Sequence, residues 1–384
     1  MAARAVLQRR FSPAPITRSK TTSAQYVAAR SIDPTFEKFM DNYKHLIKVI
    51  AVQDLILASP NEALPLPLLS SAAQRLHVRR GAPAFLRAFP HVFSLDFSSP
   101  SEPLVRLTPA AAQISRDESA AAASSSTAAI DRLSRLLSMS PSGSLPLRAV
   151  FKVWRELGLP DDFEDSIIAG NPQIFTLRDN PKEPNTHILH LSDNYHTPNP
   201  RFTPAVEQWR SEERSQPESN AAELEYAFKQ GFPPGMRLTK TFRSRLKDWQ
   251  LLPYAGPYDP LPSVGVGRAR MEKRAVGLAH EFLSLTVEKM VELEKVSQFR
   301  KWLGMDVNIR DLFLDHPGIF YLSTKGKRHT VFLREAYAKG RLIHPNPIYG
   351  TRMQLFNLVL LRKRRSDIHQ PRTSSGNQEC RGRG

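Results

Sequence analysis

One arrangement of apolar residues, a proline and alternating residues occurs three times along the chain. In each copy a pair of apolar residues stands five and four positions before a proline, and the motif Phe-x-Leu follows that proline. The three prolines are Pro90, Pro172 and Pro317. Because a proline cannot continue a helix and pushes the residue before it out of the α region, each apolar pair is predicted to lie on a short helix that stops before the proline.

A β-hairpin is predicted after each of these prolines. The alternation in Phe-x-Leu is typical of a half-buried strand. A second alternating run follows in every copy, at Leu104–Leu107, His187–Leu191 and Thr330–Leu333. In the third copy Lys325-Gly326 lies between the two runs and indicates a tight turn.

Longer helices are predicted in front of the copies. Residues 64–76 and 145–157 both begin at Leu-Pro, and proline is favoured in the first turn of a helix. In the third copy a helix is predicted at Val287–Leu303.

The prediction is an α+β fold, predominantly helical, with three winged-helix-like repeats (short helices followed by a β-hairpin) joined by polar linkers. The alternative is a recurring way to cover a small core, with no shared function. The repeat units span about 36–108, 130–193 and 277–335.

The remaining segments are assigned by their composition and their start signals. Asp33-Pro34-Thr35 opens a first long helix, because Asp and Pro are typical of a helix start. The Ala/Ser-rich stretch 110–129 and the polar stretch 192–222 are predicted to be a linker and a loop. The acidic cluster at 160–165 resembles a catalytic carboxylate group, but acidic residues at a helix start are better explained by its free N–H groups and its dipole.

The charge of the chain indicates a polyanionic partner. Lys and Arg number 54 against 37 Asp and Glu, which gives a net charge of +17 and a pI of about 10.1. This excess favours nucleic acid first and an anionic membrane second. No apolar run reaches transmembrane length, so membrane insertion is not expected. The single cysteine, Cys380, excludes an internal disulfide framework and a multi-cysteine metal site.

The two ends of the chain differ from the middle in composition. Residues 1–32 are rich in Arg, Ser and Thr and contain no acidic residue, which is typical of an organelle transit peptide. The apolar residues beside Arg4, Arg9 and Arg10 favour a mitochondrion, with a chloroplast as the alternative. Residues 363–384 are predicted to be a basic, disordered tail.

Two basic groups are the candidate RNA-binding sites. In segment 231–258 basic and aromatic residues alternate, and such residues can contact phosphates and stack on bases. For the aromatic residues, burial in a core is the favoured alternative. The third hairpin is the second candidate, because a glycine at its tip lets charged side chains project outward. The candidate residues are Arg237, Lys240, Arg243, Arg245, Lys247 and Trp249 in the first group, and Lys325, Lys327, Arg328 and Arg334 in the second.

Five stretches between residues 33 and 362 resemble, in the same order, the plant organelle RNA recognition (PORR) domain family. They are Phe-Glu-Lys-Phe-Met at 36–40, Leu-Gly-Leu-Pro-Asp-Asp-Phe at 157–163, Trp-Gln-Leu-Leu-Pro-Tyr at 249–254, His-Pro-Gly-Ile-Phe-Tyr-Leu-Ser at 316–323 and Lys-Gly-Lys-Arg-His-Thr-Val-Phe-Leu-Arg-Glu-Ala-Tyr at 325–337. The resemblance implies a nuclear-encoded protein that binds organellar RNA, mostly in the splicing of group II introns, without enzymatic activity. Its implied partners are group II intron transcripts and other splicing factors of a ribonucleoprotein complex. The family offers no agreed base-reading residues to carry over.

Other function classes find little support in the residues. A cysteine hydrolase needs a thiolate beside a histidine, and Cys380 lies in the tail. A metal-dependent nuclease needs clustered carboxylates or histidines, whereas the closest histidine pair, His187 and His190, would point to opposite faces of its strand. No catalytic residue, metal or cofactor is predicted. A winged-helix protein that binds organellar DNA and a structural component of a ribonucleoprotein or ribosome remain the alternatives.

Overall fold

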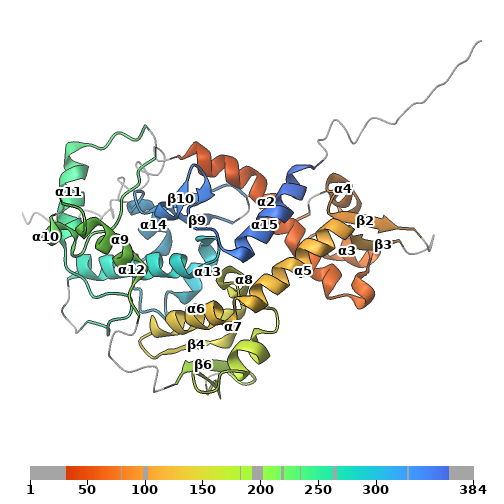
Figure 1. Cartoon of the computed structure of the whole chain (residues 1–384), viewed down its shortest axis with the longest axis horizontal. Coiled ribbons are helices and arrows are strands. Elements are labelled where there is room, and N and C mark those ends of the chain that lie inside the picture. The colour runs from red at the N-terminus through yellow and green to blue at the C-terminus, as the bar shows by residue number, and fades with distance from the viewer. Residues whose placement is uncertain are drawn as a thin grey trace, which may run out of the picture.

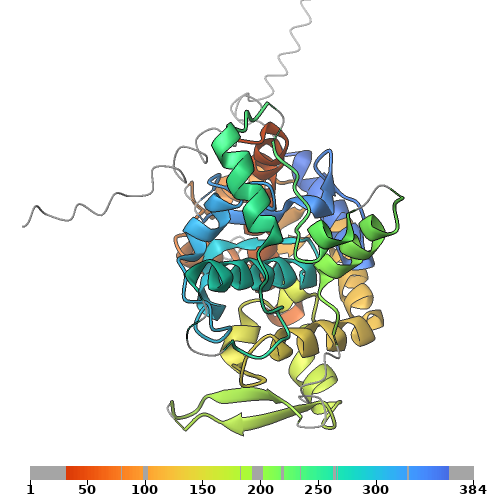
Figure 2. The same cartoon turned by 90° about the vertical axis from the view of Figure 1, so that its left-hand side faces the viewer.

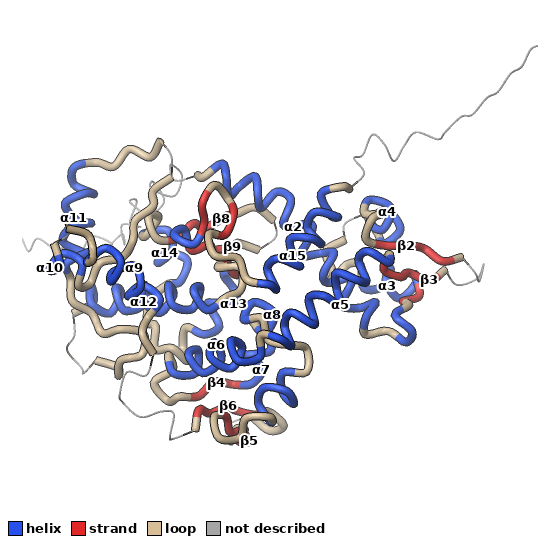
Figure 3. Tube along the Cα trace, viewed as in Figure 1, coloured by secondary structure: helices blue, strands red, loops and turns tan. Residues whose placement is uncertain are grey.

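The chain folds into one elongated body of helices and small antiparallel sheets (Figure 1). The computed structural model describes residues 32–362 except 79, 98–102, 182, 193–201, 218–219, 234, 263–264, 266 and 327. Residues 1–31 of the predicted transit peptide, the predicted tail 363–384 and Cys380 lie outside the described residues. The α+β class and the predominance of helix are confirmed, as Figure 3 shows by colour.

Unit 1 contains the first long helix and the first three-stranded sheet. Its first helix begins after Asp33, whose side chain accepts a hydrogen bond from the Thr35 N–H at 3.0 Å, as the start signal predicts. The sheet order is β1-β3-β2, and Val105 of the central strand stands opposite both Leu64 and Leu95. The elements are α2 Pro34–Leu57, β1 Leu64–Pro65, α3 Leu66–Ala72, α4 Ala82–Ala88, β2 Phe93–Asp96 and β3 Leu104–Leu107.

Unit 2 has the same series of elements as unit 1, with one more short helix, α8, between its first two strands. Its sheet order, β4-β6-β5, matches that of unit 1. The sequence predicts a helix before Pro172, and the structure has a short π-helix there. The elements are α6 Ser126–Ser138, β4 Ser144–Pro146, α7 Leu147–Phe151, α8 Trp154–Leu157, η2 Glu164–Ala169, β5 Phe175–Asp179 and β6 His187–Leu191.

Unit 3 repeats the series once more, with the sheet order β7-β9-β8. All three predicted hairpins and all three helices before the prolines are therefore confirmed. The winged-helix likeness of the units is not confirmed and stays a prediction. The elements are α12 Arg268–Leu285, β7 Met290–Glu292, α13 Leu293–Phe299, α14 Ile309–Asp315, β8 Phe320–Ser323 and β9 Thr330–Leu333.

Further elements connect and cover the units. Helix α15 packs against α2 and α5, which holds the C-terminal part of the fold on unit 1. These elements are α5 Pro109–Ser124, α9 Ala205–Arg214, α10 Ala221–Leu224, α11 Lys240–Leu251, β10 Tyr337–Ala338, β11 Arg341–Leu342 and α15 Pro347–Leu360, with short 3₁₀ turns at Pro60–Glu62 and Arg334–Ala336.

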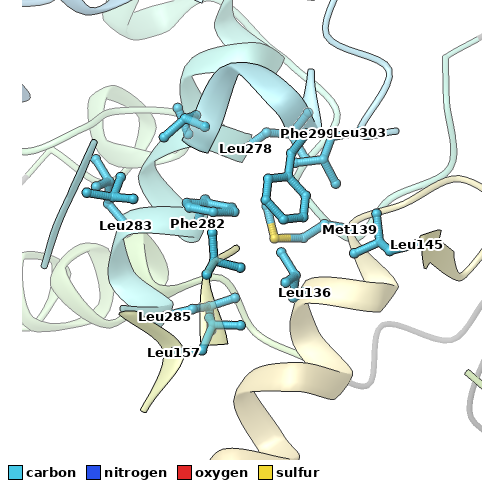
Figure 4. Packing of buried hydrophobic residues seen from close by; sticks show 14 of the residues in the cluster. Leu136, Met139, Leu145, Leu157, Leu278, Phe282, Leu283, Leu285, Phe299 and Leu303 are labelled. Atoms are coloured by element: carbon cyan, nitrogen blue, oxygen red, sulfur yellow. The ribbon is translucent and has the colours of Figure 1, made fainter. Parts of the chain in front are cut away.

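Two shared hydrophobic cores join the three units. In one, Phe36 of α2 packs against Tyr321 and Phe332 of unit 3, with ring centroids 5.0 and 4.8 Å apart. In the other, α6 of unit 2 packs against α12 and α13 of unit 3; Figure 4 shows Leu136 and Phe282 among these residues. Because unit 3 contributes to both cores, it forms the centre of the fold.

Two predictions for the connecting segments are wrong. Residues 110–129 form no linker: Thr108 caps α5 by accepting a hydrogen bond from the Ala111 N–H at 3.2 Å, and α6 follows directly. Alanine is the best helix former, and the buried Ala111 shows that the helix is part of the core. The predicted loop 192–222 contains α9 and the first two residues of α10.

The predicted long helices are also wrong in part. Leu64-Pro65 and Leu145-Pro146 belong to β1 and β4, and the helices begin only after them. The predicted helix 287–303 is replaced by β7 and α13, because β7 pairs with β9 through Val291 and Val331. In each unit this short strand separates the first helix from the others and completes the sheet.

Candidate nucleic-acid interface

Helix α11 carries most of the first predicted basic group. Thr239 caps the helix by accepting a hydrogen bond from the Phe242 N–H at 3.2 Å. Lys240, Arg243 and Lys247 are three and four residues apart, so they share one side of the helix. All five predicted basic residues of this segment are exposed: Arg237, Lys240, Arg243, Arg245 and Lys247. Figure 2 views the molecule from the end that carries α11.

These cations have few acidic neighbours. Lys247 lies 3.6 Å from Glu223, and both side chains are so exposed that water and salt weaken the pair. No ion pair joins Arg237, Lys240, Arg243 or Arg245 to an acidic side chain within the described ranges. The α11 surface, defined as these five basic residues, therefore offers four charges without an ion-pair partner among the described residues and a fifth, Lys247, that is only weakly paired.

Trp249 anchors α11 instead of facing the solvent. Its ring lies 4.7 Å from that of His316 and 5.6 Å from that of Phe228, and it packs against the main core. The side chain of Gln250 holds the segment around Phe228. Its amide oxygen accepts from the Phe228 N–H and its amide N–H donates to the Phe228 carbonyl, both at 2.8 Å. The predicted role of Trp249 in stacking bases does not fit this position, whereas the alternative of a core aromatic does.

A buried lysine fixes the C-terminal end of α11. Lys273 of α12 is 0% exposed and donates hydrogen bonds to the carbonyls of Trp249, Gln250 and Leu252 at 2.7, 2.8 and 2.8 Å. Its ammonium also lies 4.7 Å from the centre of the Trp249 ring, a cation–π contact. Burial, together with nearby Arg210, lowers the pKa of Lys273 to about 7. Lys273 thus supplies a donor to three carbonyls at the end of the helix, where intrahelical partners run out, although the Trp249 carbonyl also accepts from the Leu252 N–H at 3.2 Å.

The motif His316-Pro317-Gly318 also contacts the residues that hold α11 in place. His316 lies 3.2 Å from Glu272, and this hydrogen bond is the main cause that lowers the pKa of the Glu272 carboxyl. The Gly231 N–H donates to the Gly318 carbonyl at 2.7 Å. A Cβ on Gly318 would lie 2.1 Å from the Gln230 amide oxygen and 2.8 Å from the Phe232 ring, so both side chains would have to move to admit another residue.

The charged side chains of the third hairpin are less available to RNA than those of α11. Its loop spans 324–329, so the predicted tight turn at Lys325-Gly326 is wrong, although Gly326 does adopt a positive φ of 98°. Lys325 lies 3.4 Å from Asp41, and Arg328 lies 2.7 Å from Glu292. Lys327 lies outside the described residues. Both described cations of the hairpin therefore already have acidic partners within the fold.

Arg334 is buried, in contrast to its predicted place in the site. It forms an ion pair with Asp33 at 3.0 Å and donates to the Phe320 carbonyl at 3.3 Å. Its guanidinium also lies over the rings of Tyr321 and Phe36, at 5.1 and 5.5 Å. Arg334 joins the start of α2 to unit 3, so we leave it out of the interface.

Comparison with known proteins agrees with the resemblance in the sequence. The family described as the plant organelle RNA recognition domain matches residues 31–364, which include all three units and α11. The chain belongs to this PORR family. No solved structure matches the chain.

Three relatives span most of this PORR chain. It is 35% identical to the protein ROOT PRIMORDIUM DEFECTIVE 1 of Arabidopsis thaliana, over 91% of this chain and 87% of the relative. It is 30% identical to the mitochondrial protein WHAT'S THIS FACTOR 9 of the same plant, over 86% of this chain and 87% of the relative. The chloroplastic WHAT'S THIS FACTOR 1 of Zea mays is 29% identical, over 88% of this chain and 68% of the relative.

The acidic cluster at 160–165 lies at the start of a short helix. Asp161, Asp162, Glu164 and Asp165 are exposed around the start of η2, where the sequence places a helix start, although no side chain caps its N–H groups. His187 lies 3.1 Å from Asp179 on the neighbouring strand. The part of the chain that the structure describes holds no group of three or more His, Cys, Asp or Glu side chains placed for a metal ion. It also holds no helix long and apolar enough to cross a membrane.

A cavity of about 270 Å³ at the junction of the three units is lined by mutually paired charges. Asp54 accepts a hydrogen bond from Arg155 at 2.8 Å, and Lys295 forms an ion pair with Glu156. Such pairs hold the units together and leave the α11 surface as the stronger candidate for RNA.

Sequence reasoning missed the residues that position α11. Lys273 and Arg274 lie on α12, a helix that the sequence analysis did not predict. Arg274 donates to the carbonyls of Ala255 and Asp259 at 3.2 and 2.9 Å, which fixes the segment after α11. The spacing of Val276, Ala279 and Leu283 would have indicated a helix here, because these buried residues follow a helical period.

Proposed function

We propose that this protein binds RNA of a plant organelle and promotes the splicing of group II introns without performing the chemistry itself. Membership of the PORR family and the net charge of +17 support RNA binding. The proposed partners are intron transcripts and other splicing factors in a ribonucleoprotein complex.

The observation that carries the proposal is the α11 surface. Its exposed cations have almost no acidic neighbours, and Trp249 and Lys273 hold the helix that carries them in place. Phosphate contacts determine the position of a protein on a nucleic acid and supply much of its affinity. A fixed helix with several free cations can therefore hold an RNA backbone without reorganisation of the protein.

The proposed compartment is the mitochondrion, with the chloroplast as the alternative. The acid-free, arginine-rich composition of residues 1–32 supports an organelle in general. Among the relatives, WHAT'S THIS FACTOR 9 is named mitochondrial and WHAT'S THIS FACTOR 1 chloroplastic. A fluorescent protein fused to residues 1–40 distinguishes the two.

Replacing Arg237, Lys240, Arg243 and Arg245 by alanine should weaken RNA binding strongly. Each phosphate contact on single-stranded RNA contributes roughly −0.7 to the slope of log K against log salt. Loss of three to four contacts should flatten that slope by about 2–3 units and lower the affinity on the order of 100-fold at 0.1 M salt. The measurement is a fluorescence anisotropy titration of a group II intron RNA at several salt concentrations.

Two control variants sharpen this test. Lys301 and Arg310 are exposed on unit 3, so replacing both by alanine removes charge outside the α11 surface and should leave the slope nearly unchanged. Replacing Lys325 and Arg328, which have acidic partners, should have a smaller effect than the α11 variant. If the folded α11 variant, checked by circular dichroism, binds like the unmodified protein, the proposed interface is wrong.

A further inference from the structure

Unit 1 has a basic surface that the proposed function does not yet use. Arg75, Arg80 and Arg87 are exposed on and between α3 and α4. Residues 63–95 contain no aspartate or glutamate, and Arg79 in the same stretch lies outside the described residues. No ion pair connects Arg75, Arg80 or Arg87 to a carboxylate in the described part of the chain. We call these three arginines the unit 1 surface.

Neighbouring elements add positive charge to this end of the molecule. Lys48 of α2 donates to the His77 carbonyl at 3.0 Å, so α2 runs beside the connection between α3 and α4. The His45 ring lies 6.1 Å from that of Phe89, which directly follows α4. Burial first, and then the charges of Arg362, Lys44 and Lys48, lower the pKa of His45 to about 4. A histidine is thus kept neutral partly because the surrounding field is already positive.

The other two units show that the fold does not require these arginines. The corresponding helix of unit 2, η2, starts among four exposed acidic residues at 161, 162, 164 and 165. In unit 3, α14 carries Arg310 beside Asp311 and Asp315, which is a mixed surface. The same series of elements thus exists with acidic, mixed and basic surfaces. The charge of unit 1 is therefore better explained by a ligand than by folding.

We propose that the unit 1 surface is a second site for RNA phosphates, occupied by the same RNA molecule that binds the α11 surface. This inference rests on the proposed function. Figure 1 shows α11 and α4 at opposite ends of the long axis, so the RNA must extend along the molecule to reach both. The ligand class is consequently a long intron segment. A short oligonucleotide can occupy only one surface at a time.

The test replaces Arg75, Arg80 and Arg87 by alanine in the full chain. With a group II intron RNA, three lost phosphate contacts should flatten the salt slope by about two units. Combined with the α11 substitutions, the two reductions in slope should add, because the surfaces lie at opposite ends. A variant with lysine at the same three positions keeps the charge and should retain most of the affinity, whereas the melting temperature of all variants should stay unchanged.

The outcomes separate this inference from the proposed function. If the α11 variant loses affinity while the alanine variant of unit 1 binds intron RNA with unchanged affinity and slope, the second site is wrong and the function stands. If the unmodified protein does not bind intron RNA, the proposed function fails first. If the alanine variant loses binding only to vesicles of phosphatidylcholine with cardiolipin, the surface serves a membrane and the inference is overturned.

Discussion

Replacing Arg352 with leucine should lower the free energy of unfolding by about 3–5 kcal/mol. Arg352 of α15 is 4% exposed and donates to Glu118 of α5 and to the Arg155 carbonyl, both at 2.8 Å. It also lies 3.7 Å from Glu288, which accepts a further hydrogen bond from the Tyr43 hydroxyl. Leucine would leave the buried Glu288 and the partly buried Glu118 without their cation. Urea unfolding followed by circular dichroism measures the loss.

A second variant distinguishes the lost charge from lost packing. Burial raises the pKa of the Glu288 carboxyl, so this group is costly to keep charged without Arg352. Adding Glu288→Gln and Glu118→Gln to Arg352→Leu should recover part of the lost stability, because no uncompensated charge remains. A loss below about 1 kcal/mol for Arg352→Leu alone would contradict the role of this cluster in joining the three units.

Replacing Lys273 with methionine should weaken RNA binding although no exposed charge changes. The substitution leaves the carbonyls of Trp249, Gln250 and Leu252 without their common donor. An unsatisfied buried polar group costs about 1–3 kcal/mol, so the C-terminal end of α11 should detach more often. We expect faster hydrogen exchange in residues 240–256 and an affinity for intron RNA lower by about tenfold, since the cations of α11 are less well positioned.

Lys240→Met is the matched control for this prediction. It removes one lysine with the same side-chain change, but from an exposed position on α11. It should flatten the salt slope by about 0.7 and leave hydrogen exchange in the segment unchanged. Unchanged exchange and unchanged affinity in the Lys273 variant would show that α11 is held by its aromatic contacts alone.

The parts of the fold that follow from local patterns were predictable from the sequence. The helices before Pro90, Pro172 and Pro317 and the hairpins after them depend on proline and on alternation, both of which act over a few residues. Strands β1, β4 and β7 were missed, because two or three residues show no period and they form only by pairing with a strand far along the chain. The helix α5 was missed because its apolar face consists of small residues such as Ala111, which an Ala/Ser-rich composition conceals.

Of the candidate site, only the density of basic residues could be predicted from the sequence. The basic residues of segment 231–258 were found from their density, and those on α11 are exposed as required. Distant partners determine which cations are neutralised. Lys325 forms an ion pair with Asp41, and Arg334 forms one with Asp33; both partners lie near the other end of the chain. No local pattern contains such pairings, so the sequence could not separate free cations from paired ones.

We propose that this PORR protein binds intron RNA in a plant organelle. Immunoprecipitation of the tagged protein from isolated mitochondria and chloroplasts, followed by sequencing of the bound RNA, tests it most directly. We predict enrichment of one or a few group II intron transcripts from one organelle, and a loss of that enrichment when Arg237, Lys240, Arg243 and Arg245 are replaced by alanine. Recovery of organellar DNA or ribosomal RNA without intron RNA would contradict the claim.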